Sequence, residues 1–144
     1  MIAKVFRFVW VISVVGVGAI LLYGYAMLPE KVIVHEGETG SMEIARDTFF
    51  YITLGLLSVI NVLVFVVAKV AVRQDAFKAW FYGLIITFNA FFVIAINFIA
   101  LYNSGEVYDY KRLEVIIYAS IGLFSFWTVC WPVYIGYKRF FSQS

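Results

Sequence analysis

Hydrophobic residues in this chain gather into four long runs that are separated by short polar intervals. The runs cover residues 8–27, 48–72, 79–102 and 113–137, and each provides the roughly 20 residues that an α-helix needs to cross a bilayer. The one long polar interval is residues 28–47. The pattern therefore predicts four transmembrane helices, with a long loop between the first two and short connections elsewhere.

Local signals place several helix ends. Pro29 is expected to end the first helix, because proline disfavours the α conformation in the residue before it. Asp47 is well placed to cap the second helix by accepting hydrogen bonds from its first-turn amides. The sequence from Asn103 to Gly105 is typical of a helix C-terminus. The chain is thus predicted to be a single domain, residues 1–144, folded as an all-α antiparallel four-helix membrane bundle.

Composition supports this interpretation. The 144 residues are 64% hydrophobic and only 14% charged, which leaves too little polar surface to cover a soluble globule of this size. A signal peptide is the alternative interpretation of the first run, but the run is longer than a typical signal h-region and no convincing cleavage site follows it. The lipid bilayer is therefore the first expected partner.

Basic residues are biased toward one side of the predicted membrane. Seven lie on one side and four on the other: Lys4, Arg7, Lys69, Arg73, Lys78, Lys138 and Arg139, against Lys31, Arg46, Lys111 and Arg112. The positive-inside rule then predicts a multi-pass protein with both termini in the cytoplasm and the 28–47 loop outside. Anionic lipid head groups account for the basic inner face, so no nucleic-acid partner is expected.

Small and polar residues indicate how the helices pack. In lipid, helices associate where small side chains permit close approach and where polar side chains bond across the interface. Each run carries small or hydroxyl residues spaced three, four or seven apart, and hence on one helical face: Ser13, Gly16, Ala19, Gly55, Ser58, Gly83, Thr87, Ala90, Gly122, Ser125, Pro132 and Gly136. Asn61, Asn89 and Asn97 lie deep in the runs and are expected to form interhelical hydrogen bonds, with an ion or substrate path as the alternative.

The runs offer few residues that could carry out chemistry. No Asp, Glu, His, Arg or Lys lies near mid-membrane, which argues against a proton relay, a proton-coupled transporter or a voltage sensor. A haem is not expected because the one histidine, His35, lies in the loop. Cys130 has no second cysteine with which to form a disulfide. We therefore predict a protein that is not an enzyme, with no catalytic residues, no cofactor and no bound metal.

The polar loop contains the residue types that bind metal ions. His35 could combine with Glu36, Glu38 and Glu43 around zinc or calcium, but their spacing matches no closed ligand set and no second histidine is present. Solvated charges are the favoured interpretation of these residues.

The same loop has a pattern of its own. Val32 and Val34 alternate with other residues, which indicates a short extended segment packed on the membrane face. Gly40 permits a turn after this extended segment.

A family resemblance involves this loop. The segment from Leu28 to His35 reads Leu-Pro-Glu-Lys-Val-Ile-Val-His, with Gly40 five residues on and the basic Arg46 ahead of the next run. It resembles the first helical hairpin of a small bacterial membrane domain found at the N-terminus of SdpI-type immunity and signalling proteins. The resemblance covers about 20 of the 144 residues. It implies a location in the bacterial inner membrane, and that Leu28, Pro29, His35 and Gly40 shape the loop.

Three functions follow from these patterns. The first is a non-catalytic accessory or scaffold subunit of a larger inner-membrane assembly, which would contact other membrane subunits or further copies of itself. The second, implied by the resemblance, is an immunity or signalling protein that acts through the 28–47 loop. The third is a small transporter or lipid-handling protein that uses an asparagine-lined interior.

Overall fold

Four helices dominate the computed structural model, which describes residues 2–105 and 110–142 and, at His35 and Tyr110, the backbone alone. The helices are α1 (Ile2–Met27), α2 (Arg46–Val70), α3 (Asp75–Tyr102) and α4 (Tyr110–Phe141). An antiparallel pair of strands joins α1 to α2, namely β1 (Lys31–Gly37) and β2 (Gly40–Ala45). By length and composition each helix could cross a membrane, which agrees with the four predicted spans.

Three of the helices extend beyond the hydrophobic runs. α1 includes Lys4 and Arg7, and α4 continues through Lys138 and Arg139 to its end. Lysine and arginine have good intrinsic helix propensity, so charge does not end a helix. In α1, α3 and α4, hydropathy therefore marks the part that suits hydrocarbon, whereas the hydrogen-bonded helix is longer. α2 is as long as its run, 48–72, but begins and ends two residues earlier.

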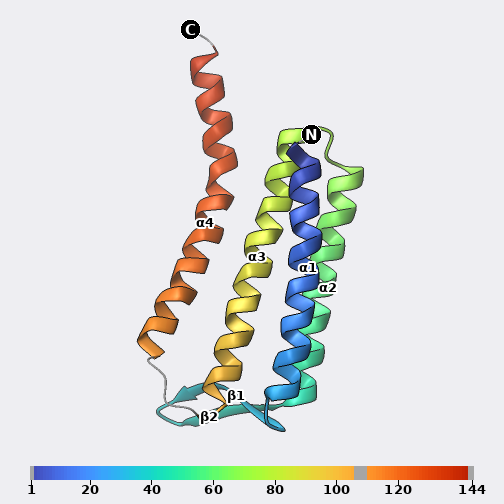
Figure 1. Ribbon diagram of the computed structural model, residues 1–144. Helices are drawn as coiled ribbons and strands as arrows, with labels where there is room; N and C mark the ends of the chain where they lie inside the picture. Colours follow the sequence, from blue (N-terminus) through green and yellow to red (C-terminus); the bar gives the residue numbers. More distant parts are fainter. Residues whose placement is uncertain (1, 106–109, 143–144) are drawn as a thin grey trace.

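α3 is the central helix of the molecule. α1 and α2 pack against it and against each other, and α4 lies along its other side (Figure 1). Over the described residues, the backbone of α4 approaches no helix other than α3, and α1 meets α4 through side chains, as in the ring contact of Phe6 with Trp127 at 5.9 Å. The architecture is thus a three-helix core with α4 attached to one flank, and it is less compact than the predicted bundle.

The hairpin lies across one end of the bundle, and the beginning of α1 and the end of α4 lie at the opposite end (Figure 1). Its strands pair from Lys31 with Ala45 to Gly37 with Gly40, with an irregularity between Ile33 and His35. Gly40 has a φ of 129°, a conformation that glycine adopts easily and other residues rarely do. The extended segment and the turn were predicted, but the second strand was not.

The start of α2 differs from the prediction. Ala45 is the residue before the helix and makes no side-chain capping bond, while Asp47 already lies within the first turn. The Asp47 carboxylate instead accepts a hydrogen bond from the Tyr25 hydroxyl at 2.6 Å, so it links α2 to α1. The predicted stop after α3 is confirmed, since Asn103 caps that helix and Gly105 has a positive φ of 75°.

The apolar core lies between α1, α2 and α3. Its buried centre is formed by Val17, Leu21, Leu57 and Ile96. These four residues come from all three helices, so the core fixes their relative positions and leaves α4 outside it.

Most of the predicted small-residue faces do not form contacts between helices of this chain. Gly83 is buried, and a Cβ placed there would collide with the ring of Trp127. Gly16, Gly55, Gly122 and Gly136 instead have open space where a Cβ would lie. The prediction failed for α4 because this helix packs on α3 with large aromatic side chains, and its small residues face outward.

Candidate functional site

Two buried asparagines form the centre of a polar network in the three-helix core. Asn61 of α2 and Asn89 of α3 exchange hydrogen bonds between their side-chain amides, at 3.0 and 2.9 Å. Their exposed fractions are 6% and 0%. The interhelical bonding that the sequence predicted for these two residues is present in the structure.

The network continues into α1. The indole Nε1–H of Trp10 donates to Asn61 Oδ1 at 3.0 Å, and Asn89 Nδ2 donates to Ser13 Oγ at 3.0 Å. Ser13 Oγ donates in turn to the Trp10 carbonyl, and Asn61 Nδ2 donates to the Leu57 carbonyl. Both N–H bonds of each asparagine amide are therefore used inside the protein. A network saturated in this way holds helices together and leaves no donor for a passing solute.

Asn97 behaves differently from the prediction. Its side chain is exposed, and Nδ2 donates to the Val93 carbonyl in its own helix at 2.9 Å. Asn97 and Asn89 are eight residues apart on α3, yet Asn89 alone reaches the facing helices. The polar interior consequently contains two asparagines rather than three.

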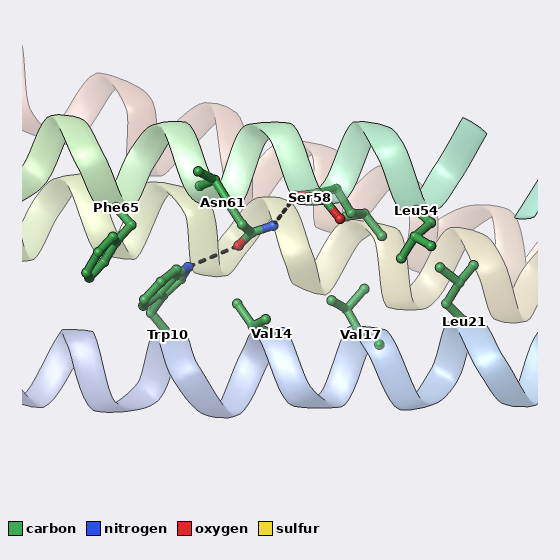
Figure 2. Close-up of a pocket in the computed structure, with 11 residues that line it drawn as sticks. Trp10, Val14, Val17, Leu21, Leu54, Ser58, Asn61 and Phe65 are labelled. Atoms are coloured by element: carbon green, nitrogen blue, oxygen red, sulfur yellow. Dashed lines mark hydrogen bonds between the residues drawn. The ribbon is translucent and has the colours of Figure 1, made fainter. Parts of the chain in front are cut away.

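A groove runs along the outside of this network, between α1 and α2 (Figure 2). It has a volume of about 310 Å³, and branched aliphatic side chains form most of its walls: Val14, Val17, Leu21, Leu54, Leu57 and Val62. Trp10 and Phe65 stack at one end of it, with ring centroids 5.6 Å apart and planes 11° apart. Beyond the other end, the rings of Tyr25 and Phe50 lie 4.8 Å apart. Aromatic pairs thus join the two helices at one end of the groove and beyond its other end.

A second cluster fixes the hairpin to the bundle. The backbone N–H of Ile33 donates to Asn103 Oδ1 at 2.8 Å, and Asn103 Nδ2 donates back to the Ile33 carbonyl at 3.1 Å. The same Nδ2 also donates to the Ile99 carbonyl within α3. Asn103 therefore bonds to β1 as a neighbouring strand would, although it belongs to a helix end. The sequence marked Asn103 as a helix stop but gave no sign of this second role.

The loop motif is anchored at its base. Leu28 is only 4% exposed, and its carbonyl accepts a hydrogen bond from Arg46 Nη1 at 3.2 Å. The Arg46 guanidinium also lies over the Tyr25 ring, 4.7 Å from its centroid. Pro29 is exposed. These contacts fix the exit from α1 and the entry to α2 relative to each other.

The loop acids Glu36, Glu38 and Glu43 are exposed to solvent. Within residues 2–105 and 110–142 no group of three His, Cys, Asp or Glu side chains is arranged to hold a metal ion, and the His35 side chain lies outside what the structure describes. The exposed carboxylates are placed as solvated charges would be.

Comparisons of this chain with protein-family models, with curated proteins and with solved structures found no match.

Proposed function

We propose that this chain is a non-catalytic accessory or scaffold subunit of a larger assembly in the bacterial inner membrane, and that it binds its partner through the outer face of α4. The supporting observation is that α4 packs on α3 with one side only. Its other side carries exposed large apolar residues along most of the helix, including Ile116, Leu123, Phe126, Val133, Tyr137 and Phe140.

Exposed apolar residues alone suit lipid, but the small residues between them indicate a helix that packs closely on this face. Gly122, Ser125, Pro132 and Gly136 are all exposed, and both glycines have open space above them. Lipid chains conform to any apolar surface and do not require small residues, whereas another helix does if it is to approach closely. The partner is therefore a transmembrane helix, either from another subunit or from a second copy of this chain.

The orientation proposed for this subunit has both termini in the cytoplasm and the hairpin outside. The excess of basic residues at the end of the bundle where α1 begins and α4 ends supports it. In this orientation the exposed acids of the hairpin face the exterior.

A photoreactive amino acid at Phe126 or Val133 tests the α4 interface in living cells. Both positions are exposed, at 68% and 61%, and Leu63 of α2, 55% exposed and with no small residue within three positions of it, is the control. We expect protein adducts from the α4 positions and only lipid adducts from Leu63. Lipid adducts from all three positions would remove the basis of the proposal.

An immunity or signalling role through the hairpin is a second candidate. It is favoured by the Asn103 contact, which holds β1 in a fixed position against α3. A loop that recognises a toxin or signal binds more tightly if it is ordered beforehand. Deletion of the gene should then sensitise cells to a membrane-active toxin, and unchanged sensitivity across a toxin panel would discard this function.

A further inference from the structure

The two strands of the hairpin expose their backbone groups on opposite edges. At the base of the hairpin the Arg46 N–H donates to the Glu30 carbonyl at 2.8 Å, so these two residues form a hydrogen-bonded pair. Bonded and non-bonded pairs alternate along an antiparallel ladder. Ile33 and Glu43 pair three steps further along in the same register, so they form a non-bonded pair. The N–H and C=O groups of each therefore point away from the other strand.

The β1 edge is closed by a side chain. Both backbone groups of Ile33 bond to the Asn103 amide, as the alternation requires. The β2 edge is different. Among the residues that the structure describes, no hydrogen bond reaches the N–H or C=O of Glu43, or the N–H of Ala45, which faces the same way two residues on. We call these three backbone groups the free edge.

The free edge lacks most of the features that protect strand edges from pairing. Natural edge strands carry lysine, proline or a bulge at such positions. The strand β2 contains no lysine and no proline, and the irregularity of the hairpin lies in β1, between Ile33 and His35. It lies at the end of the bundle, away from the packed helices (Figure 1). An extended peptide can therefore add to β2 as a further strand.

Charge decides which peptide fits. Residues 30–45 carry four exposed acids and one exposed base, namely Glu30, Glu36, Glu38, Glu43 and Lys31. Two copies of this chain that paired through β2 would bring two acidic segments together, and like charges on facing strands are destabilising. A lysine or arginine opposite Glu43 is instead favourable. The same argument excludes an acidic peptide.

We infer that the free edge of β2 binds an extended basic segment of another protein, which joins the hairpin as a third strand. Hydrogen bonds to the backbone of Glu43 and Ala45 supply affinity, and alternate basic side chains of the segment provide selectivity. Asn103 already occupies the opposite edge, so the segment adds to β2 and not to β1. This site goes beyond the scaffold role proposed above and does not depend on a helix at α4.

A proline at Ala45 tests the pairing. Ala45 has a φ of −62°, which is the value that the proline ring imposes, and its N–H does not belong to the ladder with β1. Ala45→Pro therefore removes one donor of the free edge and leaves the backbone path unchanged, while Ala45→Ser keeps the donor and is the matched control. The probe is a nine-residue peptide of alternating lysine and valine, added to the whole protein in discs of zwitterionic phospholipid. A glutamate and valine peptide of equal length is the charge control.

We expect the basic peptide to bind the parent protein and Ala45→Ser equally, and Ala45→Pro about fivefold more weakly, which corresponds to about 1 kcal/mol for one backbone hydrogen bond. The acidic peptide should not bind. Glu43→Gln, which keeps every backbone group, should weaken binding of the basic peptide about two- to threefold. Equal binding of the two peptides, equal binding by Ala45→Pro and Ala45→Ser, or no binding at millimolar peptide would each overturn the site.

Amide hydrogen exchange separates strand pairing from simple charge attraction. The N–H groups of Glu43 and Ala45 should exchange quickly in the protein alone and slow down when the basic peptide is bound. The N–H of Ile44 points toward Val32 in the ladder, so it should exchange slowly in both states. Slow exchange at Ile44 in Ala45→Pro shows in addition that the hairpin is intact in that variant. Peptide binding without slower exchange at Glu43 and Ala45 would overturn the third strand.

Discussion

Trp80 of α3 and Trp127 of α4 are joined by two reciprocal hydrogen bonds, in which each indole Nε1–H donates to the backbone carbonyl of the other residue, at 2.8 and 2.9 Å. The Trp127 ring lies directly over Gly83, one turn along α3. This pair and the neighbouring contact of Phe77 with Trp131, whose ring centroids are 5.0 Å apart, help to attach α4 to the core. The ring contact of Phe88 with Phe124, at 6.2 Å, continues this packing further along both helices.

Gly83→Ala should loosen α4. The added Cβ would lie 2.7 Å from Trp127 Nε1 and closer still to two carbons of the same ring, so the ring must move and its hydrogen bond to Trp80 must weaken. Overpacking of this kind costs about 1–3 kcal/mol. We expect a lower midpoint in detergent-induced unfolding and a changed tryptophan fluorescence spectrum. Gly122→Ala is the control, because the space above Gly122 is open. Equal stability of the two variants would contradict the proposed packing.

Asn89→Leu should destabilise the three-helix core. The variant loses three interhelical hydrogen bonds, two with Asn61 and one with Ser13. An interhelical hydrogen bond within a membrane contributes about 1 kcal/mol, so we expect a loss of about 2–3 kcal/mol of unfolding free energy. Asn97→Leu removes a bond within one helix on an exposed side chain and should change stability little. The two variants are compared by the same unfolding titration. A larger effect at Asn97 would show that the network is not a major stabilising element.

Asn103→Ala should release the hairpin from α3. It removes both bonds to Ile33, each worth about 0.5–1.5 kcal/mol, while the strand pairing itself remains. Amide hydrogen exchange over residues 31–45 should become faster, and protease should cut this segment more readily. Ser104→Ala is the neighbouring substitution for comparison, and the Ser104 hydroxyl donates to the Leu101 carbonyl. Unchanged exchange in Asn103→Ala would mean that the hairpin is held by other contacts.

The helices could be predicted from sequence because each depends on local composition, and a run of about 20 apolar residues is sufficient to recognise one. Asn61 was recognised for the same reason, as a polar residue in an apolar run. The pairing of Asn61 with Asn89 rather than Asn97 depends on how the helices are rotated about their axes. The full set of helix contacts decides that rotation, and no single run contains it.

The strand β2 and the placement of α4 also depend on contacts that no single stretch of sequence contains. The segment from Gly40 to Ala45 has no clear alternation of apolar and polar residues, and it becomes a strand because it pairs with β1. The sequence of α4 predicts its small residues as the contact face, yet Trp127 is the residue that fits against α3, because Gly83 provides the space. Such fits between two distant surfaces are not visible in one stretch of sequence.

The proposed orientation can be measured in intact cells. Cys130 is the one cysteine of the chain, so Cys130→Ser provides a background for labelling at a single introduced position. Glu38→Cys, in the hairpin turn, should react with a membrane-impermeant maleimide from outside, whereas Ser142→Cys should react only after permeabilisation. The opposite pattern would reverse the orientation and place the acidic hairpin in the cytoplasm.

The central claim is that the outer face of α4 is covered by another membrane helix. Its most direct test is the native mass of the protein, extracted from its own membranes in a gentle detergent. We expect a stoichiometric complex, either with a different membrane subunit or with a second copy, which Gly122→Phe disrupts because the bulky ring occupies the space that a partner helix would use. A protein that is monomeric at every detergent concentration tested, with or without this substitution, would contradict the account.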